Sequence, residues 1–143
     1  MFRLDHRVRV FVFQVLEDRV RYLLVRHMPV QEWPFGPVVG GVAVHEHLHD
    51  AILREVREET GFRRPLHLLE LTHPQKELFG DVGLVEWAYA WQAGSPDRPV
   101  GRIEPGPNVG EYAWMGFEEA FQHLEPAHDR DSLIRLQLRL QAG

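Results

Sequence analysis

Residues 40–62, GGVAVHEHLHDAILREVREETGF, carry the local signals that decide the fold. From about His47 the apolar and polar residues follow a helical pattern that continues to Thr60. Gly61 suits the left-handed position that ends a helix, and Phe62 suits the apolar contact that accompanies it. The stretch therefore predicts one helix over residues 47–60 with a defined end.

Three carboxylates share one edge of this helix, because Glu55 lies one turn from both Glu58 and Glu59. Like charges at this spacing cost about 0.2–0.5 kcal/mol per pair in an isolated helix. A bound divalent cation would reverse that cost, since cations such as Mg²⁺ take oxygen ligands and share them with phosphates. Glu46, upstream, could fold back toward the same edge. The alternative is a solvated surface helix in which Arg54 pairs with Glu58.

The spacing resembles the Nudix box, whose pattern is G-x5-E-x7-R-E-U-x-E-E-x-G-U, with U a bulky apolar residue. The matching residues are, in order, Gly40, Glu46, Arg54, Glu55, Val56, Glu58, Glu59, Gly61 and Phe62. Every fixed position and both spacers fit, which makes a chance match remote. The chain is identified on this ground as a member of the Nudix hydrolase family, similar to its MutT-like members.

The resemblance implies roles for these residues. Glu58 and Glu59 would be the main ligands of a Mg²⁺ or Mn²⁺ ion, and Glu55 either a further ligand or the base that activates water. Arg54 would orient Glu55 through a charge-assisted hydrogen bond, and the backbone carbonyl of Val39 would be another metal ligand. The remaining positions are Glu46, a lesser candidate ligand, and the structural residues Gly40, Val56, Gly61 and Phe62.

The residues just before and inside the start of the box depart from the family's frequent GGxVExGE sequence. Val39 stands at the first glycine, Ala43 at the earlier acidic position and His45 at the later glycine. Ala43 removes a carboxylate that some family members use near the metal. The departure bears on the number of metal ions and on the substrate, while all four box glutamates are present.

Outward from the box, strands are expected at residues 8–15, 20–26, 65–72, 84–91 and 111–115, with a short apolar run at 38–44. A turn region ends at residues 80–83, a long loop covers 93–110, and helices are expected at 117–124 and 129–140. This order indicates an α/β or α+β fold. The resemblance implies an αβα sandwich, with a mixed β-sheet and the box helix packed against it. A length of 143 residues without repeats or linkers predicts a single domain over residues 1–143, and the resemblance implies that it is a Nudix hydrolase domain.

Composition excludes several classes of protein. The chain has 16 Lys and Arg against 21 Asp and Glu, a net charge of −5, which argues against a broad basic surface for nucleic acid. The absence of cysteine excludes a disulfide scaffold and a thiol nucleophile. No apolar run approaches the roughly 20 residues of a membrane helix. We expect a cytoplasmic protein with a small-molecule nucleotide partner and no nucleic-acid or membrane partner, and leave a homodimer open.

Substrate-binding candidates lie between the second strand and the box. Arg26 ends a predicted strand, where family members often keep a basic residue that faces phosphate; the alternative is an arginine in solvent. Trp33 and Phe35 lie in the loop that leads to the box and are candidates for an aromatic platform under a base, although such aromatics more often belong to the core. Arg98 and Arg102 in the long loop are lesser candidates for phosphate contacts.

A carboxylate outside the box is a further expectation, because many Nudix enzymes take one from a later loop. In MutT-like sequences it often lies a few residues before a tryptophan that opens the last strand. Asn108 stands in that place, so Glu104 or Glu111 would have to substitute. The alternative is that both are ordinary surface glutamates.

The resemblance implies hydrolysis of a diphosphate linkage in a nucleoside diphosphate joined to another group. The sequence around the box and near Trp114 is similar to MutT-like and dihydroneopterin-triphosphate-type pyrophosphatases. A nucleoside triphosphate, cleaved to monophosphate and pyrophosphate, is therefore the favoured substrate, with an ADP-sugar or a dinucleoside polyphosphate as the nearest alternative.

Two other classes remain to be weighed. Residues 45–49 read H-E-x-x-H, the helical motif of zinc proteases, but the helical pattern starts only near His47. A Nudix module that binds a nucleotide without hydrolysing it is the third hypothesis. Such modules usually lose box glutamates.

Overall fold

The computed structural model of the chain describes residues 3–72 and 74–142. Its elements, in chain order, are β1 (Arg3–Val15), β2 (Val20–His27), the short 3-10 helix η1 (Val30–Glu32), β3 (Val38–Gly41), α1 (Leu48–Thr60), β4 (His67–Glu70), β5 (Gln75–Phe79), β6 (Val82–Gly94), β7 (Val109–Met115), α2 (Phe117–His123) and α3 (Ala127–Ala142). Along the described ranges no helix is long and apolar enough to cross a membrane.

The strands form one mixed sheet in the order β4-β6-β1-β2-β7, with β3 added beside β1 and β5 beside β6. β1 and β6 run parallel over almost their whole length, from Arg3 opposite Val82 to Gln14 opposite Gly94. The other pairs are antiparallel. The prediction of a mixed sheet is confirmed.

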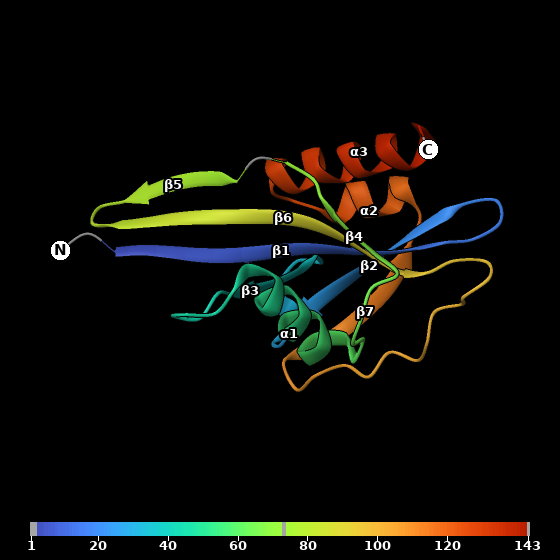
Figure 1. The fold of residues 1–143 in the computed structure, drawn as a ribbon, viewed down its shortest axis with the longest axis horizontal. Coiled ribbons are helices and arrows are strands. Elements are labelled where there is room, and N and C mark those ends of the chain that lie inside the picture. The colour runs from blue at the N-terminus through green and yellow to red at the C-terminus, as the bar shows by residue number, and fades with distance from the viewer. Residues whose placement is uncertain (1–2, 73, 143) are drawn as a thin grey trace.

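Helices cover both faces of this sheet, as Figure 1 shows, with α1 on one side and α2 and α3 on the other. The alternation of side chains along β1 explains the two layers. Val8, Val10 and Val12 pack against α1 in one core, and Phe11 and Phe13 contribute to the second core under α2 and α3. The αβα sandwich with the box helix against the sheet is therefore confirmed.

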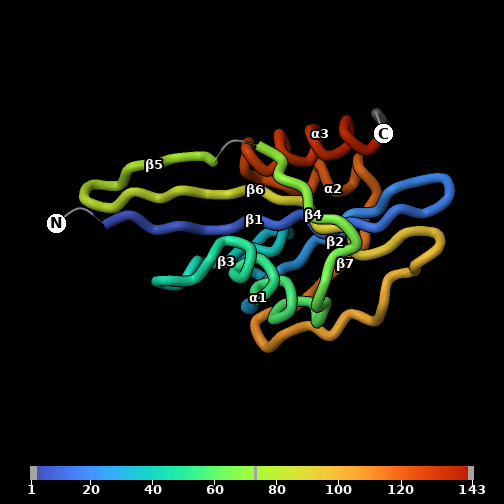
Figure 2. Tube along the Cα trace, in the orientation of Figure 1, coloured from blue at the N-terminus to red at the C-terminus, as the bar shows by residue number. Residues whose placement is uncertain are grey.

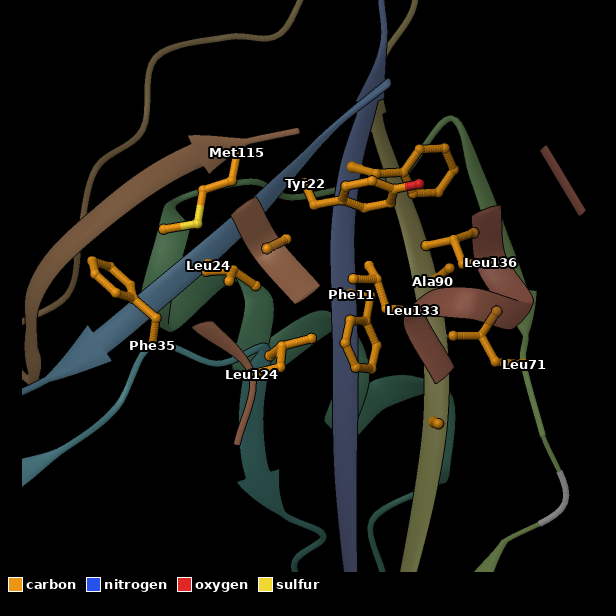
Figure 3. Packing of buried hydrophobic residues seen from close by; sticks show 13 residues of the cluster. Phe11, Tyr22, Leu24, Phe35, Leu71, Ala90, Met115, Leu124, Leu133 and Leu136 are labelled. Atoms are coloured by element: carbon orange, nitrogen blue, oxygen red, sulfur yellow. The ribbon is translucent and has the colours of Figure 1, made fainter. Parts of the chain in front are cut away.

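The core under α2 and α3 is the larger of the two and is built from long-range contacts. Figure 3 shows Phe11 between Leu124 and Leu133, with Tyr22, Leu24 and Met115 from the neighbouring strands. Burying one such side chain contributes about 1.5–3 kcal/mol. Two filled cores therefore give the chain an apolar basis for folding.

A buried ionic cluster fixes the start of α3 to the sheet within this second layer. Arg9 on β1 donates from Nε to Asp129 Oδ1 at 2.7 Å and from Nη2 to Asp129 Oδ2 at 2.5 Å. Its Nη1 also donates to Glu86 Oε2 on β6 at 3.1 Å. Asp129 is only 1% exposed. The two-pronged geometry compensates the cost of burying both charges.

The box helix ends as predicted. Gly61 has φ 83° in the left-handed region, and its N–H donates to the carbonyl of Arg57 at 2.9 Å. Phe62 packs against the core under α1. The long loop then closes over this end: the N–H of Glu104 donates to the carbonyl of Thr60 at 2.8 Å. Figure 2 traces this loop, from the end of β6 back to β7, past the end of α1.

The sequence predicted a turn region that ends at residues 80–83. This prediction was wrong for Gln75–Phe79, which form the strand β5. All five of its residues are exposed, so no alternation of buried and exposed side chains marks the strand in the sequence. β1 also begins five residues before the predicted start at Val8. In Figure 1, β5 and the adjoining ends of β6 and β1 extend beyond the helices. No helix of the described ranges covers this part of the sheet, so no face of β5 is buried in a way that would impose a pattern.

Candidate active site

Three of the box carboxylates belong to α1, and the first glycine of the box explains how closely one of them, Glu55, approaches the sheet. A Cβ placed on Gly40 would lie 1.9 Å from Glu55 Cδ and 2.2 Å from each of its carboxylate oxygens. Only a residue without a side chain leaves room there. Gly40 therefore serves close approach rather than an unusual backbone angle, since φ is positive at other residues only.

Arg54 organises the entry to the box. Its Nη1 donates to Glu55 Oε1 at 2.7 Å, as the resemblance implied, and its Nη2 donates to the carbonyl of Gly41 at 2.8 Å. Nε and Nη2 also donate to the two oxygens of Glu46 at 2.8 and 3.0 Å. The contact of Nη1 with Glu58 Oε2 is longer, at 3.5 Å.

Glu46 does fold back toward the helix, but its carboxylate is already paired. Besides Arg54, it accepts the N–H of Ala43 at 2.9 Å. The hydrogen bonds from Arg54 and from this N–H lower the pKa of Glu46 to about 2. In the described structure Glu46 therefore orients Arg54, which in turn holds Glu55.

Glu59 shows the clearest sign of a missing partner. It is 8% exposed, and its Oε1 pairs with His27, while Oε2 is buried without a hydrogen-bond partner among the described residues. Burial, together with the neighbouring charges of Glu58 and Glu59, raises the pKa of Glu55 although Arg54 opposes the shift. A cation would satisfy the orphaned oxygen and offset this repulsion, so the donor set fits a Mg²⁺ or Mn²⁺ ion.

The candidate ligands are not gathered around one point. Across the ranges that the structure describes, no three His, Asp or Glu side chains are arranged to hold an ion. Arg54 holds Glu55 and His27 holds Glu59, whereas Glu58 is largely exposed, with 55% of its side chain accessible. Glu58 is therefore the carboxylate with the most freedom to turn toward a cation. Val39, whose carbonyl was expected to contribute, lies in β3 directly before Gly40.

His27 is a site residue that the sequence reasoning missed. It is the last residue of β2, at an irregularity in the pairing with β7 that falls between Arg26 and His27. Such irregularities re-aim side chains near functional sites. The hydrogen bond with Glu59 and the charges of Glu59 and Glu55 raise the pKa of His27 against the effect of burial. A single histidine after a strand carries no sequence pattern, so only its contact with Glu59 reveals it.

A cavity of about 430 Å³ opens beside His27. The residues that line it are Arg7, Arg9, Val25, His27, Trp33, Pro34, Phe35, Gly36, Pro37, Val39, Pro126 and Asp129. Its size and its mixture of apolar walls with a few polar groups are typical of small-molecule sites. Trp33 is 53% exposed and Phe35 only 8%. The structure thus brings both predicted aromatics to one cavity, with Trp33 free to stack and Phe35 held mainly in the core.

The other predicted residues lie around this region but not among the box carboxylates. Arg26 stacks over the ring of Phe35 at 4.2 Å and contacts Glu111 Oε1 at 3.5 Å across the strands β2 and β7. Glu111 is therefore positioned by Arg26. Glu104 is exposed and caps α1 through its backbone only. Asn108 accepts the N–H of Met28 through its backbone carbonyl at 2.9 Å.

The zinc-protease interpretation of residues 45–49 is wrong. α1 begins at Leu48, His47 has an extended backbone, and His45 has φ 67°. The two histidines of the motif therefore do not share one helical face, and no described histidine belongs to a group that could hold a metal ion. The H-E-x-x-H spacing is a coincidence of a histidine-rich sequence.

Comparison with solved structures shows the same fold. A NUDIX hydrolase from Listeria monocytogenes superposes with a TM-score of 0.79 at 18% identity, over 96% of this chain and 94% of that chain. For an Ap4A hydrolase from C. elegans the TM-score is 0.75 at 14% identity, over 97% and 99%. For the NUDIX domain of Shewanella oneidensis NrtR, complexed with ADP ribose, it is 0.70 at 16% identity, over 98% and 89%.

The sequence itself matches the model of the NUDIX domain family over residues 5–137, nearly the whole chain. The match includes the box, α2, most of the sheet and the greater part of α3. The chain belongs to the Nudix family of hydrolases.

Proposed function

We propose that this Nudix hydrolase uses Mg²⁺ or Mn²⁺ to cleave a diphosphate linkage in a nucleoside diphosphate derivative. The observation that carries the proposal is the buried Oε2 of Glu59, which has no partner in the described part of the chain although it lies beside further carboxylates on α1. An unpaired buried carboxylate oxygen is costly. A cation bound there would remove this cost, and the free energy recovered would add to the affinity of the site for the cation.

The proposed division of labour follows the contacts. Glu58 and Glu59, with the carbonyl of Val39, would hold the cation, which when bound neutralises phosphate oxygens and makes water more acidic. Glu55, fixed by Arg54 and by the close approach to Gly40, accepts the proton of the attacking water. The water oxygen bonds to phosphorus while the bond from phosphorus to the bridging oxygen breaks. The leaving phosphate group keeps that electron pair.

The cavity beside His27 would hold the nucleoside. Trp33 offers an exposed ring for stacking, and Arg26, which lines the adjoining hollow and contacts Glu111 at 3.5 Å, is the candidate for contact with a phosphate oxygen. We favour a nucleoside triphosphate, cleaved to the monophosphate and pyrophosphate. This preference is supported by the MutT-like sequence around the box, together with a cavity of single-nucleoside size.

A dinucleoside polyphosphate is the second candidate, and one observation favours it. A second hollow of about 420 Å³ shares Trp33 and Pro34 with the first and is also lined by Arg26, Glu32 and Glu125. It offers space for a second nucleoside, or for the terminal sugar of an ADP-sugar. The C. elegans structure compared above is an Ap4A hydrolase, and the NrtR domain binds ADP ribose.

The test is a panel of nucleoside triphosphates, dinucleoside polyphosphates and nucleotide sugars, assayed with Mg²⁺ and with Mn²⁺ for release of phosphate or pyrophosphate. Glu58→Gln and Glu59→Gln should each lower kcat by roughly 100-fold or more, because each removes a ligand charge. Glu118→Gln, an exposed carboxylate on α2, is the matched control and should have wild-type activity.

Three results would contradict the proposal at different levels. Unchanged turnover in both box variants would refute the site. If a dinucleoside polyphosphate or nucleotide sugar exceeded every triphosphate tenfold in kcat/KM, about 1.4 kcal/mol in transition-state binding, the preferred substrate would be wrong and the chemistry would stand. Binding of nucleotides without turnover would support the non-catalytic alternative.

A further inference from the structure

His27 contacts two parts of the molecule that belong to different layers of the fold. Its ring contacts Glu59 on α1, and the same residue lines the cavity formed by the loop 33–37 and the start of α3. Because β2 ends at His27 and its pairing with β7 is irregular there, the side chain is placed by the sheet rather than by the box helix. The box motif therefore does not specify this contact.

The contact restricts Glu59 in a specific way. His27 Nε2 pairs with Oε1 of Glu59, so that oxygen is occupied, while Oε2 is buried and without a partner among the described residues. A half-turn of the carboxylate restores the same arrangement, because its two oxygens are equivalent, but intermediate rotations break the hydrogen bond. The ring thus fixes the plane of the Glu59 carboxylate, with one oxygen paired and the other free.

We infer that His27 is a positioning residue that presents Oε2 of Glu59 to the divalent cation. This inference rests on the proposed function, in which Glu59 is a metal ligand. Groups that hold a metal ligand from behind typically affect metal affinity by about 10- to 100-fold when they are removed. The conformational entropy that is lost when the carboxylate is fixed is then part of the cost of folding. Cation binding does not have to offset it again.

The experiment measures Mn²⁺ binding directly, by the loss of the electron paramagnetic resonance signal of free Mn²⁺, so it does not depend on knowing the substrate. His27→Ala removes the ring, His27→Phe keeps a ring without a donor, and His27→Gln keeps an N–H donor of similar reach. His67→Gln changes an exposed histidine on β4 and is the matched control. Circular dichroism and melting curves verify folding of each variant.

We expect His27→Ala and His27→Phe to weaken Mn²⁺ binding by about tenfold or more, and His27→Gln to recover most of the affinity. In activity assays the Mn²⁺ concentration at half-maximal rate should rise in parallel, with much of kcat regained at saturating Mn²⁺. A purely structural role would lower the melting temperature of all three variants without this recovery by glutamine. If His27→Ala fails to fold, the comparison of His27→Phe with His27→Gln remains decisive.

Mn²⁺ affinity in His27→Phe equal to or tighter than that of the wild type would overturn the inference, because His27 would then be neutral or a competitor of the cation. Equal losses in His27→Phe and His27→Gln would overturn it too. If the wild-type chain bound no Mn²⁺, this inference and the proposed function would fall together. Wild-type binding with unaffected variants would refute only the role of His27.

Discussion

The variant Gly40→Ala separates the geometry of Glu55, the carboxylate that we propose to be catalytic, from the stability of the fold. The new Cβ would lie 1.9 Å from Glu55 Cδ, whereas ordinary contacts begin near 3.4 Å. The carboxylate must therefore move by about 1.5 Å, which breaks its 2.7 Å hydrogen bond with Arg54. A displacement of about 1 Å in a reacting group can cost about 100-fold in rate. We expect kcat to fall by about this factor, or about 2.7 kcal/mol.

The stability of the same variant should change little. Gly40 does not have a positive φ, so alanine fits its backbone, and the displaced Glu55 carboxylate is the end of a flexible side chain. A glycine-to-alanine change at a compatible site alters the free energy of unfolding by about 1 kcal/mol or less. Urea unfolding, steady-state kinetics and the KM of the substrate together separate the two effects.

The neighbouring glycine provides the matched control. A Cβ on Gly41 would meet nothing within 4 Å. Gly41→Ala should therefore keep wild-type kcat. Wild-type kcat in Gly40→Ala, or an equal loss of kcat in Gly41→Ala, would refute the assignment of this glycine to the close approach of Glu55.

The remaining predictions concern metal, stability and substrate. Chelator should abolish activity but shift the melting temperature only slightly, since two apolar cores hold the fold; collapse of the circular dichroism spectrum would instead show a structural metal. Asp129→Ala should lower the free energy of unfolding, measured in urea, by about 3–5 kcal/mol, because it leaves Arg9 buried without its main partner. The control Asp131→Ala removes an exposed pair with Arg135 and should lower it by less than about 1 kcal/mol. Similar losses in the two variants would contradict the role of burial. Trp33→Ala should raise KM about tenfold at nearly unchanged kcat if the exposed ring stacks on a base, a contact that contributes about 1–3 kcal/mol, and Phe79→Ala, at the far end of the sheet, should leave KM unchanged.

Elements whose side chains alternate or repeat against a core could be predicted from the sequence. The box helix was predicted to within one residue at its start, and its end at Gly61 was predicted correctly. β5 could not be predicted, because all its side chains are exposed and no pattern of buried residues marks the strand in the sequence. Ile134 and Leu138 in α3 are apolar yet exposed, so composition alone does not define which helix face is buried.

The sequence by itself determined the family and the identity of the box carboxylates, because fixed spacing on a helix places Glu55, Glu58 and Glu59 on one edge whatever surrounds them. The contacts of Arg54 with Glu55 and Glu58 within the helix could also be anticipated, whereas only the tertiary structure decided the long-range contacts. His27 reaches Glu59 from 32 residues away, and Arg9 reaches Asp129 from 120 residues away. Such pairs follow from the register of strands and the docking of helices, which are set by burial over the whole chain and leave no local spacing to read.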